Sequence, residues 1–202
     1  DGNTMVVGFE TDHFYEKSYF NAVAQLQKTI KSLQGVTAIL NIPDVVNLVN
    51  DTAAAQFKSV KIFTPPYTSQ GGLDSAALVF KSLPFYKTLL YSPTSNAYLM
   101  GVSLDGAIIN SKNRSTLVAK INNAISAFEK QTQSTVQLSG LPYIRTIVAD
   151  RIKKEMNIFL IASFVLSALT LLLFFRSISA MLMSMVVVAI GVIWSLGTVV
   201  LL

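Results

Sequence analysis

The only histidine of the chain, His13, stands close to two carboxylates, Glu10 and Asp12. These side chains could bind a metal ion, but the neighbouring sequence supplies no further nitrogen or sulfur ligand, and the chain has no cysteine. A catalytic serine would have to use the same histidine, and the G-x-S-x-G motif of a nucleophile elbow is absent. The phosphate-binding motifs G-x-x-x-x-G-K-[ST] and G-x-G-x-x-G are absent too. We therefore expect His13 to lie in a solvated loop, and we expect no metal, no cofactor and no enzymatic activity.

A second group of candidate residues is aromatic and lies in the middle of the chain. The segment from about residue 43 to residue 96 is irregular in pattern and rich in aromatic side chains. Four of these are candidate substrate contacts: Phe80, Phe85, Tyr86 and Tyr91. One interpretation is that the aromatic residues pack this segment onto a sheet. The other is that they line an apolar cleft for a hydrophobic substrate.

The charges divide the chain into two parts. Residues 1–150 carry 12 Lys or Arg and 10 Asp or Glu, a net charge of +2, which is typical of an ordinary soluble surface. Residues 151–202 carry 4 Lys or Arg and 1 Glu, and Arg176 is the only charge after Glu155. The first part has no basic run of the kind that follows a phosphate backbone, so we expect no nucleic-acid partner.

Two uncharged apolar runs dominate the second part. The first, about residues 156–175, has 20 residues; at 1.5 Å per residue it would span about 30 Å, the thickness of the hydrocarbon core of a bilayer. The second covers about residues 178–202. The connection between them is so short that we expect a tight antiparallel transmembrane hairpin. Because the chain starts without an initiator methionine and ends inside an apolar run, we interpret it as a fragment of a longer protein.

Each apolar run carries a stripe of small or hydroxylated residues at helical spacing. This pattern favours packing between helices, and the alternative is a face that lines a substrate path. The stripe residues that we predict to pack against other helices are Ser163, Ser167, Thr170, Gly191, Ser195 and Thr198. Four basic residues flank the runs and are predicted to lie at the membrane interface: Arg151, Lys153, Lys154 and Arg176. No ionisable residue lies inside either run, so these helices encode no proton relay.

The remaining pattern predicts two strand–helix–strand units in residues 1–150. The first has strands at residues 4–11 and 36–40, with apolar residues at helical spacing from Tyr19 to Leu33 between them. The second has strands at residues 97–104 and 134–140, around a helix that Asn113 or Ser115 caps. Two such units on one sheet predict an α+β, ferredoxin-like split βαβ domain with its helices on one face.

The segment between the two units is expected to be an insert at about residues 43–96. Pro65-Pro66 and Gly71-Gly72 act as breakers of regular structure. A short helix is expected from Asp74 to Leu83, and a second at residues 85–91. The insert is therefore predicted to be irregular and partly helical.

Several short segments resemble the resistance-nodulation-division (RND) transporter superfamily. They are Gly140-Leu141-Pro142, Phe174-Phe175-Arg176-Ser177 and the VIWSLG segment at residues 192–197. Each is weak alone, but their order and spacing, from Thr4 to Leu202, are similar to the MMPL or "predicted exporter" branch, which is related to hopanoid exporters and Patched-like proteins. The branch commonly has a Ser-x-Asp-Gly turn before a strand, whereas residues 92–95 of this sequence are Ser-Pro-Thr-Ser.

The resemblance implies that residues 1–150 form a periplasmic porter domain and that the apolar runs are transmembrane helices 2 and 3 of a bacterial inner-membrane protein. The expected partners are membrane lipid, a hydrophobic substrate, and the remaining helices and second porter domain of the same protein. A homodimer or homotrimer is compatible with the resemblance. The family's acidic proton-relay residues belong to helices outside this sequence.

Two functions remain open at this stage. The first is proton-motive-force-driven export of lipids or other hydrophobic compounds. The second is a membrane-anchored ligand-binding or sensor module of the sterol-sensing or Patched-like type, without transport of its own. The basic residues beside the first apolar run, taken alone, would place residues 1–150 in the cytoplasm by the positive-inside rule, whereas the resemblance implies the periplasmic side.

Overall fold

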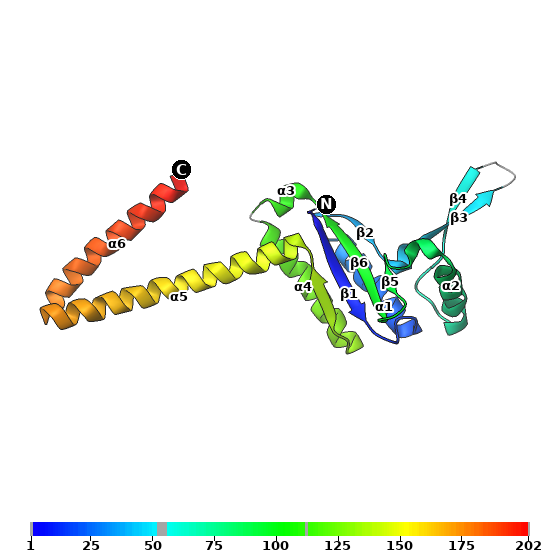
Figure 1. The fold of residues 1–202 in the computed structure, drawn as a ribbon, viewed down its shortest axis with the longest axis horizontal. Coiled ribbons are helices and arrows are strands. Elements are labelled where there is room, and N and C mark those ends of the chain that lie inside the picture. Colours follow the sequence, from blue (N-terminus) through cyan, green and yellow to red (C-terminus); the bar gives the residue numbers. More distant parts are fainter. Residues whose placement is uncertain (1, 52–55, 112, 202) are drawn as a thin grey trace. The chain divides into compact units, whose positions relative to one another are not determined.

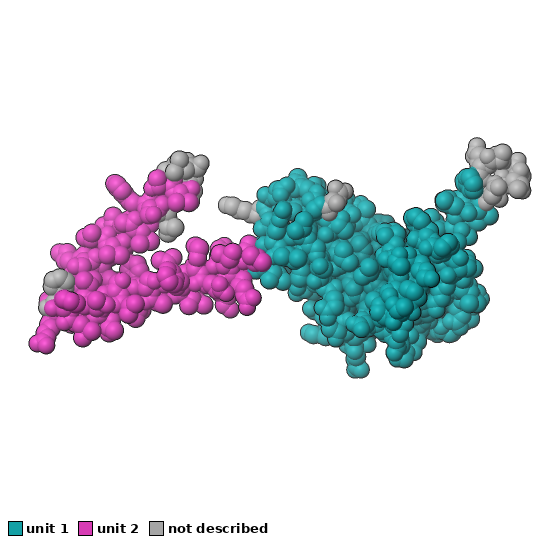
Figure 2. All heavy atoms as spheres, in the orientation of Figure 1, with its two compact units in different colours: residues 1–147 teal, residues 148–202 magenta. Residues whose placement is uncertain are grey.

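The computed structural model describes residues 2–51, 56–111 and 113–201. The chain divides into two compact units, residues 1–147 and residues 148–202 (Figure 2). The first contains all the strands and the second contains only helix and a short connection. Each unit is described by itself below.

The first unit is built on an antiparallel sheet (Figure 1). Its long strands are β1 (Thr4–Glu10), β2 (Val36–Leu40), β6 (Ala97–Leu104) and β7 (Val136–Ser139), in the spatial order β2-β6-β1-β7. β1 pairs with β6 along its whole length and with β7 on its other side. This is the strand order of a ferredoxin-like split βαβ fold, so the predicted fold class is confirmed.

Two long helices, α1 (Lys17–Lys31) and α4 (Asn113–Thr132), cover one face of the sheet. Every second residue of β1 and β6 is buried, as expected for strands with one covered face. The apolar residues of the helices recur at three- and four-residue intervals and join the same core. Large buried side chains from these elements include Met5, Phe9, Tyr19, Phe20, Ile30, Tyr98, Met100, Ile121 and Phe128. We call the four long strands with α1 and α4 the framework.

The insert contains more regular structure than the sequence indicates. Its elements are η1 (Ile42–Asp44), β3 (Val46–Asp51), β4 (Gln56–Lys61), α2 (Gln70–Ser82), η2 (Pro84–Tyr86) and β5 (Tyr91–Ser92). β3 and β4 form a two-stranded sheet that extends away from the framework (Figure 1). The β3–β4 hairpin was not predicted, because its strands mix apolar, polar and charged residues on both faces.

Two expectations about the insert need correction. The expected helix at residues 85–91 is wrong: η2 ends at Tyr86, Thr88 has a φ of 67°, and Tyr91 pairs with Tyr98 of β6. A residue with positive φ cannot continue a right-handed helix. The helix expected from Asp74 begins earlier, at Gln70, so that Gly71 and Gly72 lie in its first turn instead of breaking it.

The segment Gly140-Leu141-Pro142 joins β7 to the next helix, and its residue types have a physical reason. Gly140 has a φ of 113°, and a Cβ atom there would lie 2.5 Å from the backbone oxygen of Thr4, so only glycine fits. Pro142 falls in the first turn of a helix, where its missing N–H costs nothing. The Gly140 carbonyl accepts a hydrogen bond from the Ile144 N–H, which starts the helix.

The helices α5 (Leu141–Phe175) and α6 (Ile178–Leu201) contain the two apolar runs. Both are long and apolar enough to cross a membrane. Only Arg176 and Ser177 separate them, as the sequence predicts, and Arg176 ends α5 with a φ of 46°. α5 starts 15 residues before the apolar run at Met156, because the charged residues that precede the run also form helix. Among residues 148–174, 176–195 and 197–199, no side chain is buried.

Candidate substrate-binding surface

The four aromatic residues singled out in the insert lie together. The ring centroids of Phe80 and Tyr86 are 5.4 Å apart, those of Phe80 and Tyr91 are 5.3 Å apart, and those of Phe85 and Tyr86 are 5.1 Å apart. Their exposure differs sharply: Phe80 and Tyr86 are buried, Tyr91 is half-buried, and Phe85 is 74% exposed. Of the four, only Phe85 presents most of its ring to a ligand in this conformation.

The chain turn after α2 explains this division. α2 buries Leu73, Ala77 and Phe80, which share one helical face. Pro84 then starts η2, where Phe85 points outward and Tyr86 is buried. The Tyr86 hydroxyl donates to the Val46 carbonyl at 2.7 Å and accepts from the Val46 N–H at 3.3 Å. Tyr86 therefore fixes the start of β3.

Phe85 belongs to a short stretch of the insert with other exposed apolar side chains. Leu78 is 72% exposed, and Val79 and Leu89 are each nearly half exposed. We call Leu78, Val79, Phe85 and Leu89 the insert surface. Each of these side chains offers an apolar ligand or partner surface from which water can be excluded.

Aromatic contacts also connect the insert to the framework. Phe80 lies 5.7 Å from Phe63, and Phe63 lies 4.9 Å from Phe20 of α1. Phe14, just before α1, contacts Phe20 and stacks on Tyr98 of β6 at 3.9 Å. The buried members of the aromatic group thus pack the insert onto the sheet and α1, and Phe80 is the first link in this series.

Side-chain hydrogen bonds to backbone groups strengthen the attachment. Asn21 of α1 donates to the Tyr67 carbonyl at 2.9 Å and accepts from the Tyr67 N–H at 2.8 Å. Gln70 of α2 accepts from the Lys17 N–H at 2.9 Å and so caps the first turn of α1. Sequence reasoning missed Asn21 and Gln70, since a polar residue on a helix surface gives no signal of its partner.

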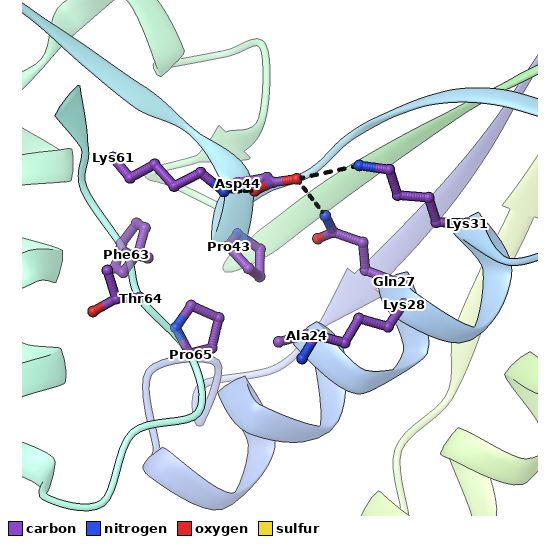
Figure 3. Close-up of a pocket in the computed structure, with 10 residues that line it drawn as sticks. All are labelled: Ala24, Gln27, Lys28, Lys31, Pro43, Asp44, Lys61, Phe63, Thr64 and Pro65. Carbon is purple, nitrogen blue, oxygen red and sulfur yellow. Dashed lines mark hydrogen bonds and ion pairs between the residues drawn. The ribbon is translucent and has the colours of Figure 1, made fainter. Parts of the chain in front are cut away.

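A groove lies between α1 and the insert (Figure 3). Its volume is about 390 Å³. Both apolar and basic residues line the groove, and no pattern in the sequence predicts it. We call it the basic groove; its apolar lining residues are Ala24, Pro43, Phe63 and Pro65, and its basic lining residues are Lys28 and Lys31 of α1 and Lys61 of β4.

Asp44 is the only carboxylate among the residues that line the basic groove in the described part of the chain. It accepts a hydrogen bond from Lys61 Nζ at 2.8 Å and one from Gln27 Nε2 at 3.0 Å, and Lys31 Nζ lies 4.0 Å away (Figure 3). The hydrogen bond from Lys61 lowers the pKa of Asp44, against the opposing effect of partial burial. Gln27 in turn accepts from the buried Asn41 at 3.1 Å, so the carboxylate belongs to a network that joins α1 to η1 and β4.

The flanking basic residues and His13 lie on surfaces. Arg151 Nε is 3.5 Å from Glu155, and Lys153 and Lys154 are exposed. His13 Nδ1 is 2.7 Å from Glu16, and both side chains are exposed. Within residues 2–51, 56–111 and 113–201, no group of three or more His, Cys, Asp or Glu side chains is placed to hold a metal ion.

The small and hydroxylated residues of α5 and α6 mostly meet their own helices or open space. Thr170 donates to the Leu166 carbonyl at 2.8 Å, and Thr198 donates to the Trp194 carbonyl at 2.6 Å. A Cβ atom added at Gly191 would meet no atom within 4 Å. Ser163 is partly exposed, and Ser167 and Ser195 are exposed. Helix packing through this stripe therefore stays a prediction.

A comparison with curated proteins found no match. The model of the MMPL family, whose members are RND-type membrane transporters, matches residues 5–202, which include the framework, the insert and both apolar helices. The resemblance seen in the short motifs is confirmed over nearly the full length, and the chain belongs to the MMPL family of membrane transporters.

Proposed function

We propose that this chain is part of an exporter of lipids or other hydrophobic compounds, and that the insert surface contacts the substrate. The observation that supports this role is Phe85, a 74% exposed aromatic side chain next to the buried and hydrogen-bonded Tyr86. An aromatic side chain has few rotatable bonds, so it loses little conformational freedom when it binds an apolar ligand. Such a role requires the surface to bind and release the substrate, and it requires no set of catalytic residues.

The proposed location is the bacterial inner membrane, with residues 1–150 on the periplasmic side. Family membership and the length of the two apolar helices support a membrane protein. The periplasmic placement of residues 1–150 derives from the family resemblance, whereas the positive-inside rule alone would place them in the cytoplasm. Arg151, Lys153 and Lys154 would then meet anionic headgroups at the outer surface, and Arg176 would lie at the cytoplasmic end of the hairpin.

The proposed energy source is the proton-motive force. Residues 156–175 and 178–202 contain no ionisable residue within an apolar run, so proton-relay residues would have to come from other helices of the full-length protein. Those helices, together with a second porter domain, would also supply the partners for the stripe of small residues on α5 and α6. Assembly as a dimer or trimer belongs to the same proposal.

The test is export of a fluorescent hydrophobic compound by cells that express the full-length protein. Phe85→Ala should reduce the export rate several-fold, because truncation removes the exposed ring. The matched control is Phe57→Ala, since Phe57 is 75% exposed but lies on the β3–β4 hairpin. Equal export by the Phe85 variant, the Phe57 variant and the unmodified protein, across a panel of apolar compounds, would contradict the role of the insert surface.

A protonophore separates transport from mere binding. Collapse of the proton gradient should abolish export by the unmodified protein. Persistent export after collapse would contradict the proposed energy source, and binding of the compounds without any export would favour the sensor-module alternative.

The proposed orientation has its own test. A cysteine introduced at the exposed position Asn122 on α4 should react with a membrane-impermeant thiol reagent in intact cells. Protection of that cysteine until the cells are lysed would place residues 1–150 in the cytoplasm and contradict the proposal.

A further inference from the structure

The basic groove extends along α1 beyond the region around Asp44. A second hollow of about 70 Å³ shares three lining residues with it, Ala24, Lys28 and Pro65. The added wall consists of Asn21, Gln25 and Pro66. The two hollows therefore adjoin, and Lys28 stands where they meet.

The charges along this groove do not cancel. Lys28, Lys31 and Lys61 supply three positive charges, and Asp44 supplies one negative charge, which leaves a net charge of +2. Asp44 already accepts hydrogen bonds from Lys61 and Gln27. Within the described part of the chain Lys28 forms no ion pair, and its side chain is exposed at the groove. Its ammonium group is therefore available to an incoming anion.

The groove also has an apolar lining, most of which comes from the insert and is firmly held. Pro43 and Phe63 are buried, and Pro65 is partly buried. The insert segment that carries Pro65 and Pro66 is fixed to α1 by the two hydrogen bonds between Asn21 and Tyr67. A ligand that fits here needs an anionic group for the lysines and an apolar part for the proline and phenylalanine side chains. A volume of this size suits a headgroup and the first part of an alkyl chain.

We infer that the basic groove binds the phosphate or carboxylate headgroup of an anionic amphiphile, with Lys28 as its principal cationic contact. This inference rests on the proposed export function and names the substrate class as anionic amphiphiles. The insert surface around Phe85 then contacts apolar substrate, and the basic groove selects for charge.

The test measures binding of a short, water-soluble amphiphile to the full-length protein in nanodiscs of zwitterionic lipid. The probes are octyl phosphate, the neutral octyl glucoside and inorganic phosphate, and isothermal titration calorimetry gives their dissociation constants. Signals from empty nanodiscs are subtracted, which removes partition into the bilayer. Octyl phosphate should bind at least about fivefold more tightly than either of the other probes, because only it has both an anionic group for the lysines and an alkyl chain for the apolar lining.

Substitutions at Lys28 assign the site. Lys28→Gln should weaken octyl phosphate binding about fivefold or more, since one charge-assisted contact is lost. Lys28→Arg keeps the charge and should stay within about twofold of the unmodified protein. Lys130→Gln is the matched control, because Lys130 is an exposed lysine on α4 that does not line the groove.

Three results would overturn the inference. The first is equal binding of octyl phosphate and octyl glucoside. The second is an equal loss of octyl phosphate binding in Lys28→Gln and Lys130→Gln. The third is binding of inorganic phosphate as tight as that of octyl phosphate, which would show recognition of the anion alone. The binding assay does not depend on transport. Specific octyl phosphate binding without export supports the groove and contradicts the exporter proposal, whereas export of hydrophobic compounds without such binding contradicts the groove alone.

Discussion

The framework and the insert are held together by different means. In the framework, β1 and β6 bury every second residue, and α1 and α4 bury one face each in the same core. The insert has a two-stranded sheet and short helices that are attached to α1 by buried rings and by side-chain hydrogen bonds to backbone groups. An isolated two-stranded hairpin is marginally stable in water. The position of the insert therefore depends on contacts with the framework.

This difference bears on function because both candidate sites involve the insert. The insert surface lies on α2, η2 and the following turn, and one wall of the basic groove comes from η1, β4 and the residues after it. Loosening the insert should therefore disturb both sites while the framework sheet survives.

The largest expected effect separates the two regions directly. Phe80→Ala removes a fully buried ring that contacts Phe63, Tyr86 and Tyr91, and should cost about 3–5 kcal/mol. Hydrogen exchange followed by mass spectrometry should show faster exchange across residues 56–91, with β1 and β6 still protected. Phe85→Ala, at an exposed ring, should change stability by less than about 0.5 kcal/mol. Equal loss of protection in the sheet and the insert would show that the two regions unfold as one.

Gly140→Ala tests the framework at its junction with α5. The new Cβ would lie 2.5 Å from the Thr4 carbonyl oxygen, at a φ of 113° that L-residues rarely adopt. We expect a cost of about 2–3 kcal/mol, measured as a lower thermal unfolding midpoint in detergent. Gly71→Ala is the control, because a Cβ there meets no atom within 4 Å. A neutral Gly140→Ala variant would mean that β1 and β7 can move apart without cost.

Asn21→Ala tests the hydrogen-bonded attachment without removing a ring. It leaves the backbone N–H and carbonyl of Tyr67 without their side-chain partners, which should cost about 1–3 kcal/mol. Limited proteolysis should then cut the segment around Tyr67 faster than in the unmodified chain. Asn122→Ala, at an exposed asparagine of α4, should leave the cleavage rate unchanged. If both variants are cleaved alike, the Asn21 contacts do not hold the insert.

The smallest effect concerns Asp44 and depends on pH. Because its pKa is lower in the folded state than the ordinary value of 3.8, ionised Asp44 stabilises the fold above pH 3.8, and this contribution is lost as the pH falls through the folded pKa. Asp44→Asn should cost about 0.5–1 kcal/mol at pH 7, as expected for a partly exposed ion pair. The difference between the two unfolding midpoints should shrink towards pH 3. A difference that stays constant with pH would contradict the role assigned to the charge.

The sequence anticipated the framework closely because its elements carry regular periodicity. The strand at residues 36–40 and the strand at residues 97–104 were predicted with the observed bounds, and the helix spacing of Tyr19, Val23 and Leu26 appears in α1. The β3–β4 hairpin lacks such a pattern. The aromatic group was recognised from composition, but the sequence could not separate the buried Phe80 from the exposed Phe85, since both are phenylalanines in apolar surroundings.

The sequence by itself determined the two long apolar helices, the ferredoxin-like order of strands and helices, and membership of the MMPL family. These follow from local periodicity, the length of uncharged runs and the order of short motifs. Only the tertiary structure decided which aromatic rings face solvent, how Asn21 and Gln70 hold the insert, and that Lys61 of β4 borders the same groove as Lys28 and Lys31 of α1. Those features depend on long-range contacts, and a side chain's partner across 40 residues leaves no mark on the pattern around either residue.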